Sequence, residues 1–345
     1  MRIAVVTPRT HHHEHTRRST RLAGITSGLQ HAGHEVSIIT TRWWGQRQLA
    51  HHGRYTTHRF GGEGSLTGRS VARRLFDLDV DIIHLVDVHP AIVRAAGVVG
   101  RLRRTPIVYE ANDFETPLMS NALLHRRARR RIDRVIAPSG VVETMILEAG
   151  VRAPIDRIPD PVDIDRVAGT VPDSRADIIW AAQGAGASEV DLVLLGLAEL
   201  RDHRWHGALL GPMDDPSAVH TAVDDLGLGD RVQIIDDITP RERIAIYRGG
   251  RVFIQTAAVC PFPTELMLAM AAGCVGVVQY QEYSSAHELV ERTRHGELIS
   301  TPEQIASAIK RAAQREANTF DASYQNFEPE MVAKQLVESY QAALS

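Results

Sequence analysis

Residues 132–139 read IDRVIAPS, in which the β-branched run Arg134–Ile136 predicts a short strand; a helical pattern follows at Val141–Glu148. Outward from this stretch, toward the N-terminus, the same order of strand and helix returns. Short strands that alternate with amphipathic helices are typical of βα units around a parallel sheet. The other strands expected in this half are Ile3–Val6, Glu35–Ile39, Ile82–Leu85 and Ile107–Tyr109, and the other helices are Ser19–Ala32 and Ala91–Arg103.

The second half of the chain shows the same alternation, so we predict an α/β protein with two doubly wound, Rossmann-like sheets. The strands expected here are Ile178–Ala181, Ala208–Leu210, Val232–Ile235, Val252–Gln255 and Val275–Val278. The expected helices are Asp191–Asp202, Ala218–Leu226, Pro240–Tyr247, Thr264–Ala272, Ser284–Glu291 and Pro302–Arg315.

A length of 345 residues suits two domains of about 150 residues each. The proline-containing segment Ile158–Ser174 lacks periodicity and is expected to connect them. We therefore predict domains over 1–165 and 166–325. Residues 326–345 form an amphipathic terminal helix that belongs to neither βα series.

Composition excludes several classes of protein. The net charge of -3 does not favour nucleic-acid binding, and Cys260 and Cys274, the only cysteines, provide neither a disulfide framework nor a zinc site. Lysine occurs only as Lys310 and Lys334, which argues against a P-loop or a pyridoxal enzyme. No apolar run approaches the roughly 18 residues of a membrane span, so we expect a cytoplasmic protein.

Several segments, taken in order, match motifs that belong together in one protein family. Asp81–His84 is similar to a "D-V-V-H" strand, and Pro106–Glu110 with Asp113 is similar to a "Y-E-x-x-D" segment. The further matches are Ile132–Ser139 to "A-D-x-V-I-x-x-S", Ile158–Asp163 to "I-P-N-G-V-D", Arg251–Ile254 to "A-D-V-F-V" and Ala269–Val275 to "A-M-A-x-G-x-P". Together these segments resemble glycosyltransferase family 4.

This resemblance implies the GT-B fold, with two domains that face each other across a cleft and a C-terminal helix that returns to the first domain. It also implies retaining, metal-independent transfer of a sugar from a nucleoside diphosphate sugar to a glycan or lipid-linked acceptor, without a cofactor. The first domain would hold the acceptor and the second the donor. Ligands of such sheets bind at the carboxyl ends of the strands.

The sequence departs from the family at the residues that hold the donor. Gln183 and Glu189 stand where the family has Arg and Lys for the diphosphate, and Cys260 and Leu268 stand where it has two Glu residues. Asn112 replaces the His that usually follows the "Y-E" strand, and we keep it as a catalytic candidate. Because charged contacts are worth about 1.5–3 kcal/mol each, a second hypothesis is an inactive GT-B module that binds a glycan, a lipid or a partner enzyme.

Glu265 is the carboxylate nearest to the lost pair and is our first catalytic candidate. It could contact the donor, or it could only complement the dipole of the helix whose first turn it occupies. Phe262 and Thr264 belong to the loop that opens this helix, and Thr264 is the expected N-cap beside an anion site. We include both, with Gly211, among the donor-binding candidates.

The loop that contains Gln183, Gly184 and Gly186 follows a strand and opens a helix. Its glycines could let the backbone approach a phosphate of the donor. They also half match a dinucleotide fingerprint, so a nucleotide-cofactor enzyme is a third, weaker hypothesis. The simplest alternative is a tight connection.

Basic residues are concentrated after the first strand, in a loop that would face the ligand. His15, Arg17 and Arg21 are candidates for binding the phosphate of an acceptor or the diphosphate of a donor, although a solvated helix face would show the same pattern. The consecutive residues His11–His15 are unsuited to converge on one metal ion, so we predict no metal site. His89, with Asp87, is a candidate base in the loop after the third strand.

The run Arg126–Arg131 is the densest concentration of charge in the sequence. A basic helix suits peripheral contact with anionic lipid headgroups, and a solvated helix face is the alternative. Nucleic acid is not expected as a partner, because aromatic residues do not alternate with these arginines.

Overall fold

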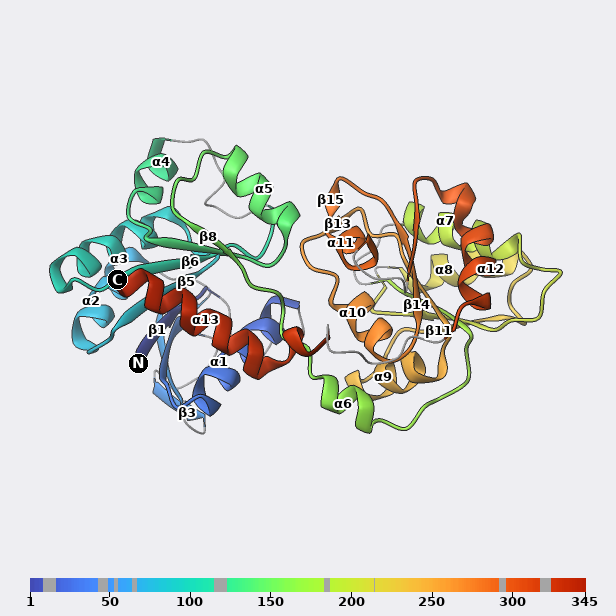
Figure 1. Ribbon diagram of the computed structural model, residues 1–345, viewed down its shortest axis with the longest axis horizontal. Helices are drawn as coiled ribbons and strands as arrows, with labels where there is room; N and C mark the ends of the chain where they lie inside the picture. Colours follow the sequence, from blue (N-terminus) through green and yellow to red (C-terminus); the bar gives the residue numbers. More distant parts are fainter. Residues whose placement is uncertain are drawn as a thin grey trace. The chain divides into compact units, whose positions relative to one another are not determined.

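The computed structural model describes residues 1–8, 17–42, 49–52, 55–63, 67–114, 123–182, 187–213, 215–291, 296–316 and 324–345 (Figure 1). The chain divides into two compact units. Unit 1 comprises Met1–Pro161 together with Asn326–Ser345, and unit 2 comprises Val162–Gln325.

Unit 1 is built on an eight-stranded sheet with the strand order β3-β4-β2-β1-β5-β6-β7-β8. All neighbouring strands are parallel except β3 and β4, which pair as an antiparallel hairpin. The strands are β1 (Arg2–Val6), β2 (Glu35–Arg42), β3 (Leu49–His52), β4 (Tyr55–Glu63), β5 (Ile82–Val86), β6 (Ile107–Glu110), β7 (Arg134–Ala137) and β8 (Ile155–Arg157).

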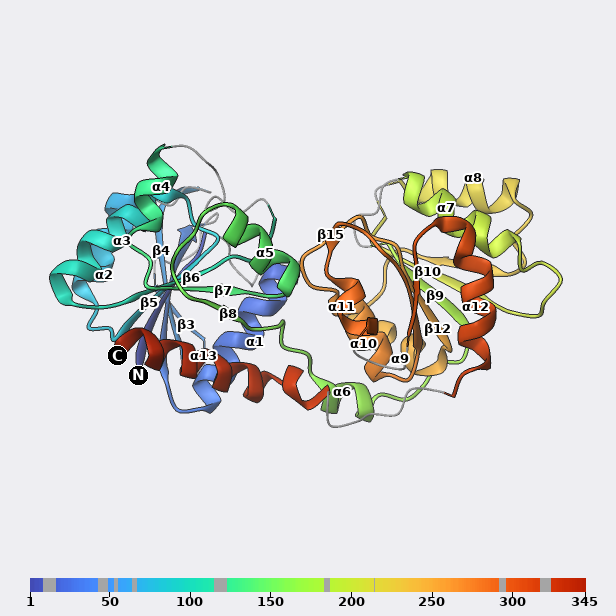
Figure 2. The same ribbon diagram turned by 45° about the horizontal axis from the view of Figure 1, so that its top comes forward.

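Side chains that alternate along each strand divide the core of unit 1 into two layers. Ala4 and Val6 of β1 pack with one set of helices, and Ile3 and Val5 pack with the other. The first set comprises α2 (Gly68–Asp77), α3 (Pro90–Arg103), α4 (Leu123–Arg129) and α5 (Gly140–Glu148), and the second comprises α1 (Arg17–His31) and α13 (Pro329–Leu344) (Figure 2). This sheet is therefore covered on both faces, as the doubly wound prediction requires.

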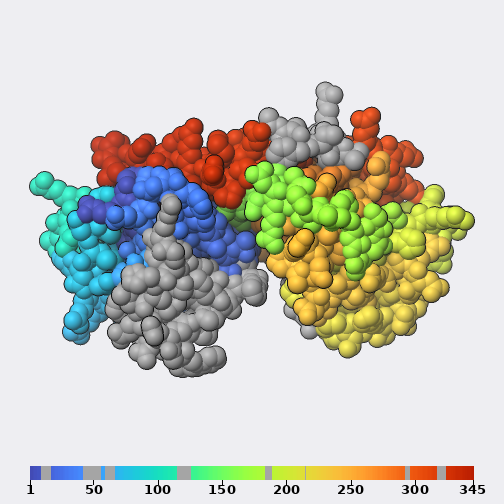
Figure 3. Space-filling model, turned by 90° about the horizontal axis from the view of Figure 1, so that it is seen from below, coloured from blue at the N-terminus to red at the C-terminus, as the bar shows by residue number. Residues whose placement is uncertain are grey.

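The C-terminal helix α13 packs directly along α1, and in the space-filling view its red atoms border the blue atoms of the N-terminal part of unit 1 (Figure 3). The approach is close because Gly28 of α1 has no side chain. A Cβ atom at Gly28 would lie 2.6 Å from the carbonyl oxygen of Pro329 and 2.8 Å from Cβ of Ala333.

Unit 2 contains a six-stranded parallel sheet with the order β11-β10-β9-β12-β14-β16. Its strands are β9 (Ile178–Ala181), β10 (Gly207–Leu210), β11 (Val232–Ile235), β12 (Val252–Gln255), β14 (Val275–Gln279) and β16 (Gly296–Ile299). A separate parallel pair joins β13 (Val259–Cys260) to β15 (Tyr283–Ser284). The predicted class, α/β with two doubly wound sheets, is confirmed.

Helices cover both faces of this second sheet as well. One face packs against α7 (Ala187–Ala198), α8 (Pro216–Asp225) and α12 (Ile305–Gln314), which the short η2 (Pro302–Gln304) precedes. The other face packs against α9 (Pro240–Gly249), α10 (Thr264–Ala271) and α11 (Ala286–Glu291). A second short 3-10 helix, η3 (Tyr324–Phe327), lies just before α13.

Several elements differ from the sequence expectations. The hairpin β3–β4, α2, β8 and β16 were not predicted, and helix α7 begins four residues before the expected Asp191. The segment Ile158–Ser174 is not wholly irregular, because α6 (Ile164–Gly169) lies within it. Asp163 explains this helix: its carboxylate accepts a hydrogen bond from the N–H of Arg166 and so satisfies an amide at the helix start.

Candidate functional site

In unit 1, polar side chains gather where α1 begins and where β5 and β6 end. Asp87 follows β5 and has a left-handed backbone (φ 48°), a conformation that Asp tolerates better than most residues. Its Oδ1 accepts a hydrogen bond of 3.0 Å from the N–H of Asn112, which follows β6. Two neighbouring loops at the carboxyl edge of the sheet, the edge at which doubly wound sheets generally bind ligands, are thereby joined.

Arg21 of α1 lies at the centre of a buried ion cluster beneath these loops. Its side chain is 0% exposed, its Nε donates to Glu110 at 3.0 Å, and one terminal nitrogen donates to Asp160 at 2.8 Å. The remaining donors contact the carbonyl oxygens of Pro159 and Ile158. Arg21 thus ties α1 to the end of β6 and to the last residues of unit 1 before the chain enters unit 2.

The electrostatics of this cluster keep both Arg21 and Glu110 charged. Burial would raise the pKa of Glu110, but the guanidinium of Arg21 and the imidazole of His84, 3.2 Å away, hold that pKa well below its ordinary value. Burial would lower the pKa of Arg21, yet the charges of Glu110 and Asp160 raise it. A paired charge is the form in which a buried ion is tolerated.

The expectation that Arg21 binds a phosphate is therefore corrected, because its guanidinium is enclosed and uses its donors within the protein. Arg17 shares that face of α1 but reaches Asp160 at 2.6 Å and the carbonyl oxygen of Asn112 at 2.8 Å. It is half-buried, so a ligand role for Arg17 stays a prediction. His15 lies outside the described residues.

Asn112 and His89 have different surroundings. Asn112 is buried, and its Oδ1 has no hydrogen-bond partner. His89 is exposed and stands at the N-cap of α3, where its Nδ1 accepts a hydrogen bond from the N–H of Ala91 at 3.2 Å. The structure thus gives His89 a capping contact, and its catalytic role stays a prediction.

In unit 2, Glu265 lies in the first turn of α10 and is held from α9. The hydroxyl of Tyr247 donates to its carboxylate, and Arg243 lies 3.5 Å from the same oxygen. Arg243 also donates to the carbonyl oxygen of Gly211, immediately after β10. The structure therefore brings two of the predicted residues, Glu265 and Gly211, to one cluster. Burial raises the pKa of Tyr247 well above its ordinary value, so this phenol remains a hydrogen-bond donor.

Sequence reasoning missed Arg243 and Tyr247. Their spacing of four residues on a predicted helix was a usable signal, because such residues share a helix face. Nothing in the sequence placed that face toward Glu265. Asp160 was also missed as a partner of Arg17 and Arg21, since it lies in the segment that was interpreted only as a domain connection.

The start of α10 differs in one respect from expectation. Pro263 occupies the N-cap, and Thr264 is the first helical residue, so Thr264 is not the N-cap. Phe262 is buried, and its carbonyl oxygen accepts a hydrogen bond from the N–H of Thr264 at 3.0 Å. Gln183, Gly184 and Gly186 lie outside the described residues.

The positions that depart from the family have contacts of their own. Glu189 accepts a hydrogen bond from the N–H of Ala258 at 2.9 Å, which joins the first turn of α7 to the loop after β12. The carbonyl oxygen of Cys260 accepts the N–H of Ser285 at 2.8 Å, next to the pairing of β13 with β15. Both residues therefore help to shape the carboxyl edge of the unit 2 sheet.

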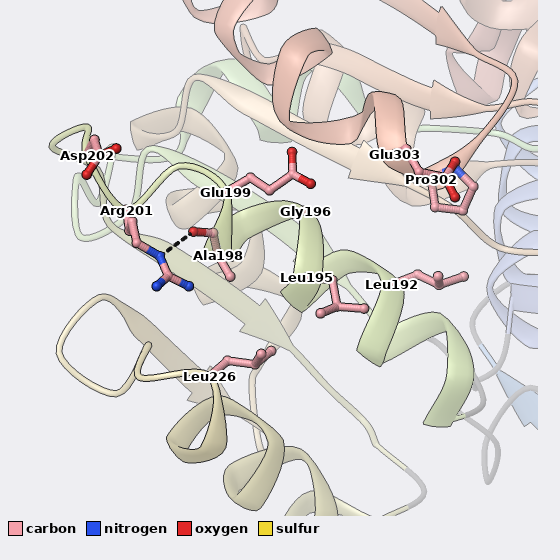
Figure 4. Close-up of a pocket in the computed structure, with 10 residues that line it drawn as sticks. All are labelled: Leu192, Leu195, Gly196, Ala198, Glu199, Arg201, Asp202, Leu226, Pro302 and Glu303. Carbon is pink, nitrogen blue, oxygen red and sulfur yellow. Dashed lines mark hydrogen bonds between the residues drawn. The ribbon is translucent and has the colours of Figure 1, made fainter.

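A groove of about 730 Å³ lies on the outer side of α7 (Figure 4). Leu192 and Leu195 are exposed there, and Glu199, Asp202 and Glu303 line the same groove. Asp202 belongs to the connection that leads to the start of β10, at the opposite edge of the sheet from Gly211. This groove is separate from the Glu265 cluster.

Two protein-family models match successive parts of this chain. The model for Glycosyltransferase Family 4 matches residues 19–166, and the model for glycosyl transferases group 1 matches residues 177–315. The chain belongs to glycosyltransferase family 4. The first match falls on unit 1 except for its last residues, 162–166, and the second match falls on unit 2; together they cover most of this family 4 protein. The resemblance inferred from the sequence motifs is confirmed.

Solved structures show that this family 4 chain has the GT-B fold. A glycosyltransferase from Rickettsia africae has a TM-score of 0.76 at 16% identity, with 100% of this chain and 98% of that chain covered. Anabaena HepE in complex with UDP and glucose has a TM-score of 0.69 at 17% identity, with 99% and 100% covered. The apo lipopolysaccharide outer core galactosyltransferase WaaB has a TM-score of 0.70 at 13% identity, with 99% of each chain covered. No curated protein matches the sequence.

Metal-ligating side chains do not cluster in the described part of the chain. No group of three or more His, Cys, Asp or Glu residues there could hold a metal ion. The run His11–His15 falls outside that part. The two clusters themselves present guanidinium, carboxylate, amide and hydroxyl groups.

Proposed function

We propose that this glycosyltransferase transfers a sugar, with retention and without a metal, from a nucleoside diphosphate sugar to a glycan or lipid-linked acceptor. Unit 2 would bind the donor and unit 1 the acceptor. The observation that carries the proposal is the cluster of Glu265, Arg243 and Tyr247 beside Gly211. It stands at the carboxyl end of β10 and the N-terminus of α10, where phosphates bind in such sheets.

The reaction sets clear demands on this cluster. A bond forms between the acceptor oxygen and the anomeric carbon, while the bond from that carbon to the β-phosphate oxygen breaks and the proton of the acceptor hydroxyl passes to the departing phosphate. The departing nucleoside diphosphate gains negative charge, which amides at a helix N-terminus and a nearby guanidinium can stabilise. Glu265, kept in place by two donors, is the group we propose to contact the sugar of the donor.

A matched pair of variants tests the role of Glu265. The purified protein is titrated by calorimetry with UDP, GDP, their sugar conjugates and NAD, and turnover is then measured with the nucleotide sugar that binds. Glu265→Ala is expected to abolish turnover. Glu330→Ala, which removes an exposed first-turn acid from α13 in unit 1, should leave turnover unchanged. Failure of every sugar nucleotide to bind at millimolar concentration contradicts the proposal.

An inactive GT-B module that binds a glycan, a lipid or a partner enzyme is the alternative. Two observations favour it: Glu189 stands at a position where the family has a Lys, and the charge of Arg243 is balanced by Glu265. Under this alternative Glu265→Ala would change only stability. Binding of a sugar nucleotide without any turnover, including hydrolysis of the donor, would support it.

Peripheral contact of unit 1 with a membrane is a further part of the proposal. Arg126, Arg127 and Arg130 are exposed, and the stem of Arg131 packs against Gly97 of α3. On α3 itself Leu102 is 67% exposed, next to the exposed Arg101. Arginines around an exposed apolar side chain suit an anionic lipid surface. No helix among the described residues is long and apolar enough to cross a bilayer.

Sedimentation with lipid vesicles tests this contact. The protein should bind vesicles that contain phosphatidylglycerol and not vesicles of phosphatidylcholine alone, and added salt should weaken binding. The pair Arg126→Glu and Arg127→Glu should prevent binding. The matched pair Arg204→Glu and Arg241→Glu, at exposed sites of unit 2, should not. Equal loss in both pairs would indicate only a general charge effect and would contradict a specific surface.

A further inference from the structure

A pocket of about 390 Å³ opens at the amino ends of the unit 2 strands. The first residues of β9 and β12, the connection that leads to β10 and the last turns of α12 line it. This edge of the sheet is opposite to the carboxyl edge, where the Glu265 cluster lies. The volume falls within the range of small-molecule sites, about 300–1,000 Å³.

The interior of this pocket is apolar and already formed. Leu200, Val252 and Ile309 line it and belong to the buried core. The indole of Trp205 is only 6% exposed, and its Nε1 donates to the carbonyl oxygen of Leu200 at 2.9 Å. The guanidinium of Arg231 lies over the indole, 5.7 Å from the ring centre. Because the protein itself holds this wall in place, a ligand need not order it on binding.

Positive charge predominates in the lining. The charged side chains there are those of Arg204, Arg251 and Lys310 and one carboxylate, Asp177. Oδ2 of Asp177 already accepts the N–H of His206 at 2.9 Å, and the side chain of Asp177 is 61% exposed. The pocket therefore favours a ligand with negative charge.

Two of these cations retain donors for a ligand. The guanidinium of Arg251 is anchored at the end of α12, because its Nε donates to the carbonyl oxygen of Ala313 at 3.0 Å and its Nη2 donates to that of Arg315. Nη1 of Arg251 and the ammonium of Lys310 have no hydrogen-bond or ion-pair partner among the described residues. An anchored guanidinium and an unpaired ammonium beside an apolar wall suit a single anionic head group.

We propose that this pocket binds a small monoanion with an apolar body, namely an aliphatic or aromatic carboxylate. The carboxylate accepts hydrogen bonds from Arg251 and Lys310, and the apolar body lies against Trp205 and Ile309. The site takes no part in the proposed sugar transfer, because it uses the edge of the sheet opposite to the donor cluster.

Three variants separate the charge of the pocket from its shape. Lys310→Met removes the ammonium at an exposed helix position and keeps a residue that favours helix. Lys334→Met is the matched control, because Lys334 is the only other lysine of the chain and is exposed on α13 of unit 1. Ala313→Leu adds bulk to the pocket wall at an exposed position of α12 and also favours helix.

The full chain is titrated by saturation-transfer NMR with octanoate, with cinnamate and with the corresponding neutral alcohols, octanol and cinnamyl alcohol. At least one carboxylate should bind, and its alcohol should bind roughly tenfold more weakly, because the alcohol lacks the charged contacts. Lys310→Met should weaken the carboxylate roughly fivefold, as expected for a solvent-facing ion pair, and should leave the alcohol unchanged. Ala313→Leu should weaken both ligands, and Lys334→Met should weaken neither.

The two carboxylates distinguish the sources of the ligand. Binding of octanoate alone supports an aliphatic ligand, and binding of cinnamate alone supports an aromatic one. The proposal is overturned if neither carboxylate binds at millimolar concentration, if a carboxylate and its alcohol bind equally, if the two lysine variants have equal effects, or if Ala313→Leu has none. The titration requires neither a sugar nucleotide nor turnover, so its failure is distinguishable from failure of the proposed function.

Discussion

The hydroxyl of Tyr340, in the last helix of the chain, lies 2.8 Å from Nδ1 of His84 in β5. The other ring nitrogen of His84 lies 3.2 Å from Glu110, which in turn is bound by Arg21. A continuous line of buried polar groups therefore runs from α13 through the sheet to α1. The C-terminal helix contributes to the position of Glu110, two residues before Asn112.

Tyr340→Phe should lower the free energy of unfolding by about 1–3 kcal/mol, because it leaves a buried acceptor or donor of His84 unpaired. Urea denaturation followed by circular dichroism measures the change. Tyr280→Phe removes a hydroxyl from a residue that is 51% exposed and should have little effect. Equal stability of the two variants would show that the Tyr340 contact contributes nothing.

Arg21→Met should strongly lower the free energy of unfolding. It leaves Glu110 and Asp160 buried without their guanidinium, and breaking a buried pair costs about 3–5 kcal/mol. The comparison variant is Arg157→Gln, whose guanidinium is 53% exposed in its ion pair with Glu143, so that the pair should be worth below about 1 kcal/mol. If the free energy of unfolding falls by a similar amount in the Arg21→Met and Arg157→Gln variants, Arg21 has no central role in stability.

Acid should destabilise unit 1 through Glu110. The pKa of Glu110 is lower in the folded protein than in the unfolded chain, so its contribution to the free energy of unfolding is fully present above the unfolded pKa of about 4.3 and is lost as the pH falls below that value. Free energies of unfolding measured from pH 7 to pH 3 should therefore decline. Glu110→Gln should be less stable at pH 7 and should show a shallower decline; a slope identical to that of the unchanged protein would refute this assignment.

Gly28→Ala should destabilise the contact of α1 with α13. The added Cβ would lie 2.6 Å from the carbonyl oxygen of Pro329, so the helices must move apart, at a cost of about 1–3 kcal/mol. Gly169→Ala is the matched control, because nothing lies within 4 Å of a Cβ at that position. Thermal denaturation of both variants measures the difference, and a more stable Gly28→Ala protein would contradict the packing described.

Arg243→Leu should weaken the binding of a nucleotide sugar by roughly tenfold, since about 1.4 kcal/mol corresponds to a factor of ten. The substitution removes the cation beside Glu265 and the donor to the carbonyl oxygen of Gly211. Arg241→Leu changes an exposed residue of the same helix and should leave affinity unaltered. Calorimetric titration of both variants distinguishes a local effect from a general one.

Much of the fold could be predicted because local patterns specified it. β-branched runs such as Val232–Ile235 coincide with observed strands, and the capping box of Thr239 and Glu242 marks the beginning of α9. The hairpin β3–β4 was missed, since its histidine-rich residues Leu49–His52 lack the usual strand composition.

The candidate site was predictable only in part. Glu265 could be found because it follows a recognisable loop, and Arg17 and Arg21 could be assigned to one helix face by their spacing. Their partners could not be found. Glu110 and Asp160 lie 89 and 139 positions from Arg21 along the chain, and such pairing depends on tertiary packing that no local pattern records. For this reason the sequence predicted a ligand-binding role for Arg21, whereas the structure shows that Arg21 is buried and paired within the protein.

The division of unit 1 between the two ends of the chain has a consequence for biosynthesis. Leu336 and Tyr340 of α13 complete the core beside α1, but the ribosome reaches them only after the whole of unit 2 has been made. At roughly 5–20 residues per second, that interval is on the order of ten seconds. During this interval, the apolar surface of α1 that α13 later covers would be open to solvent and to chaperones. Unit 1 therefore cannot complete its core until α13 has been synthesised, whereas unit 2 is free to fold earlier.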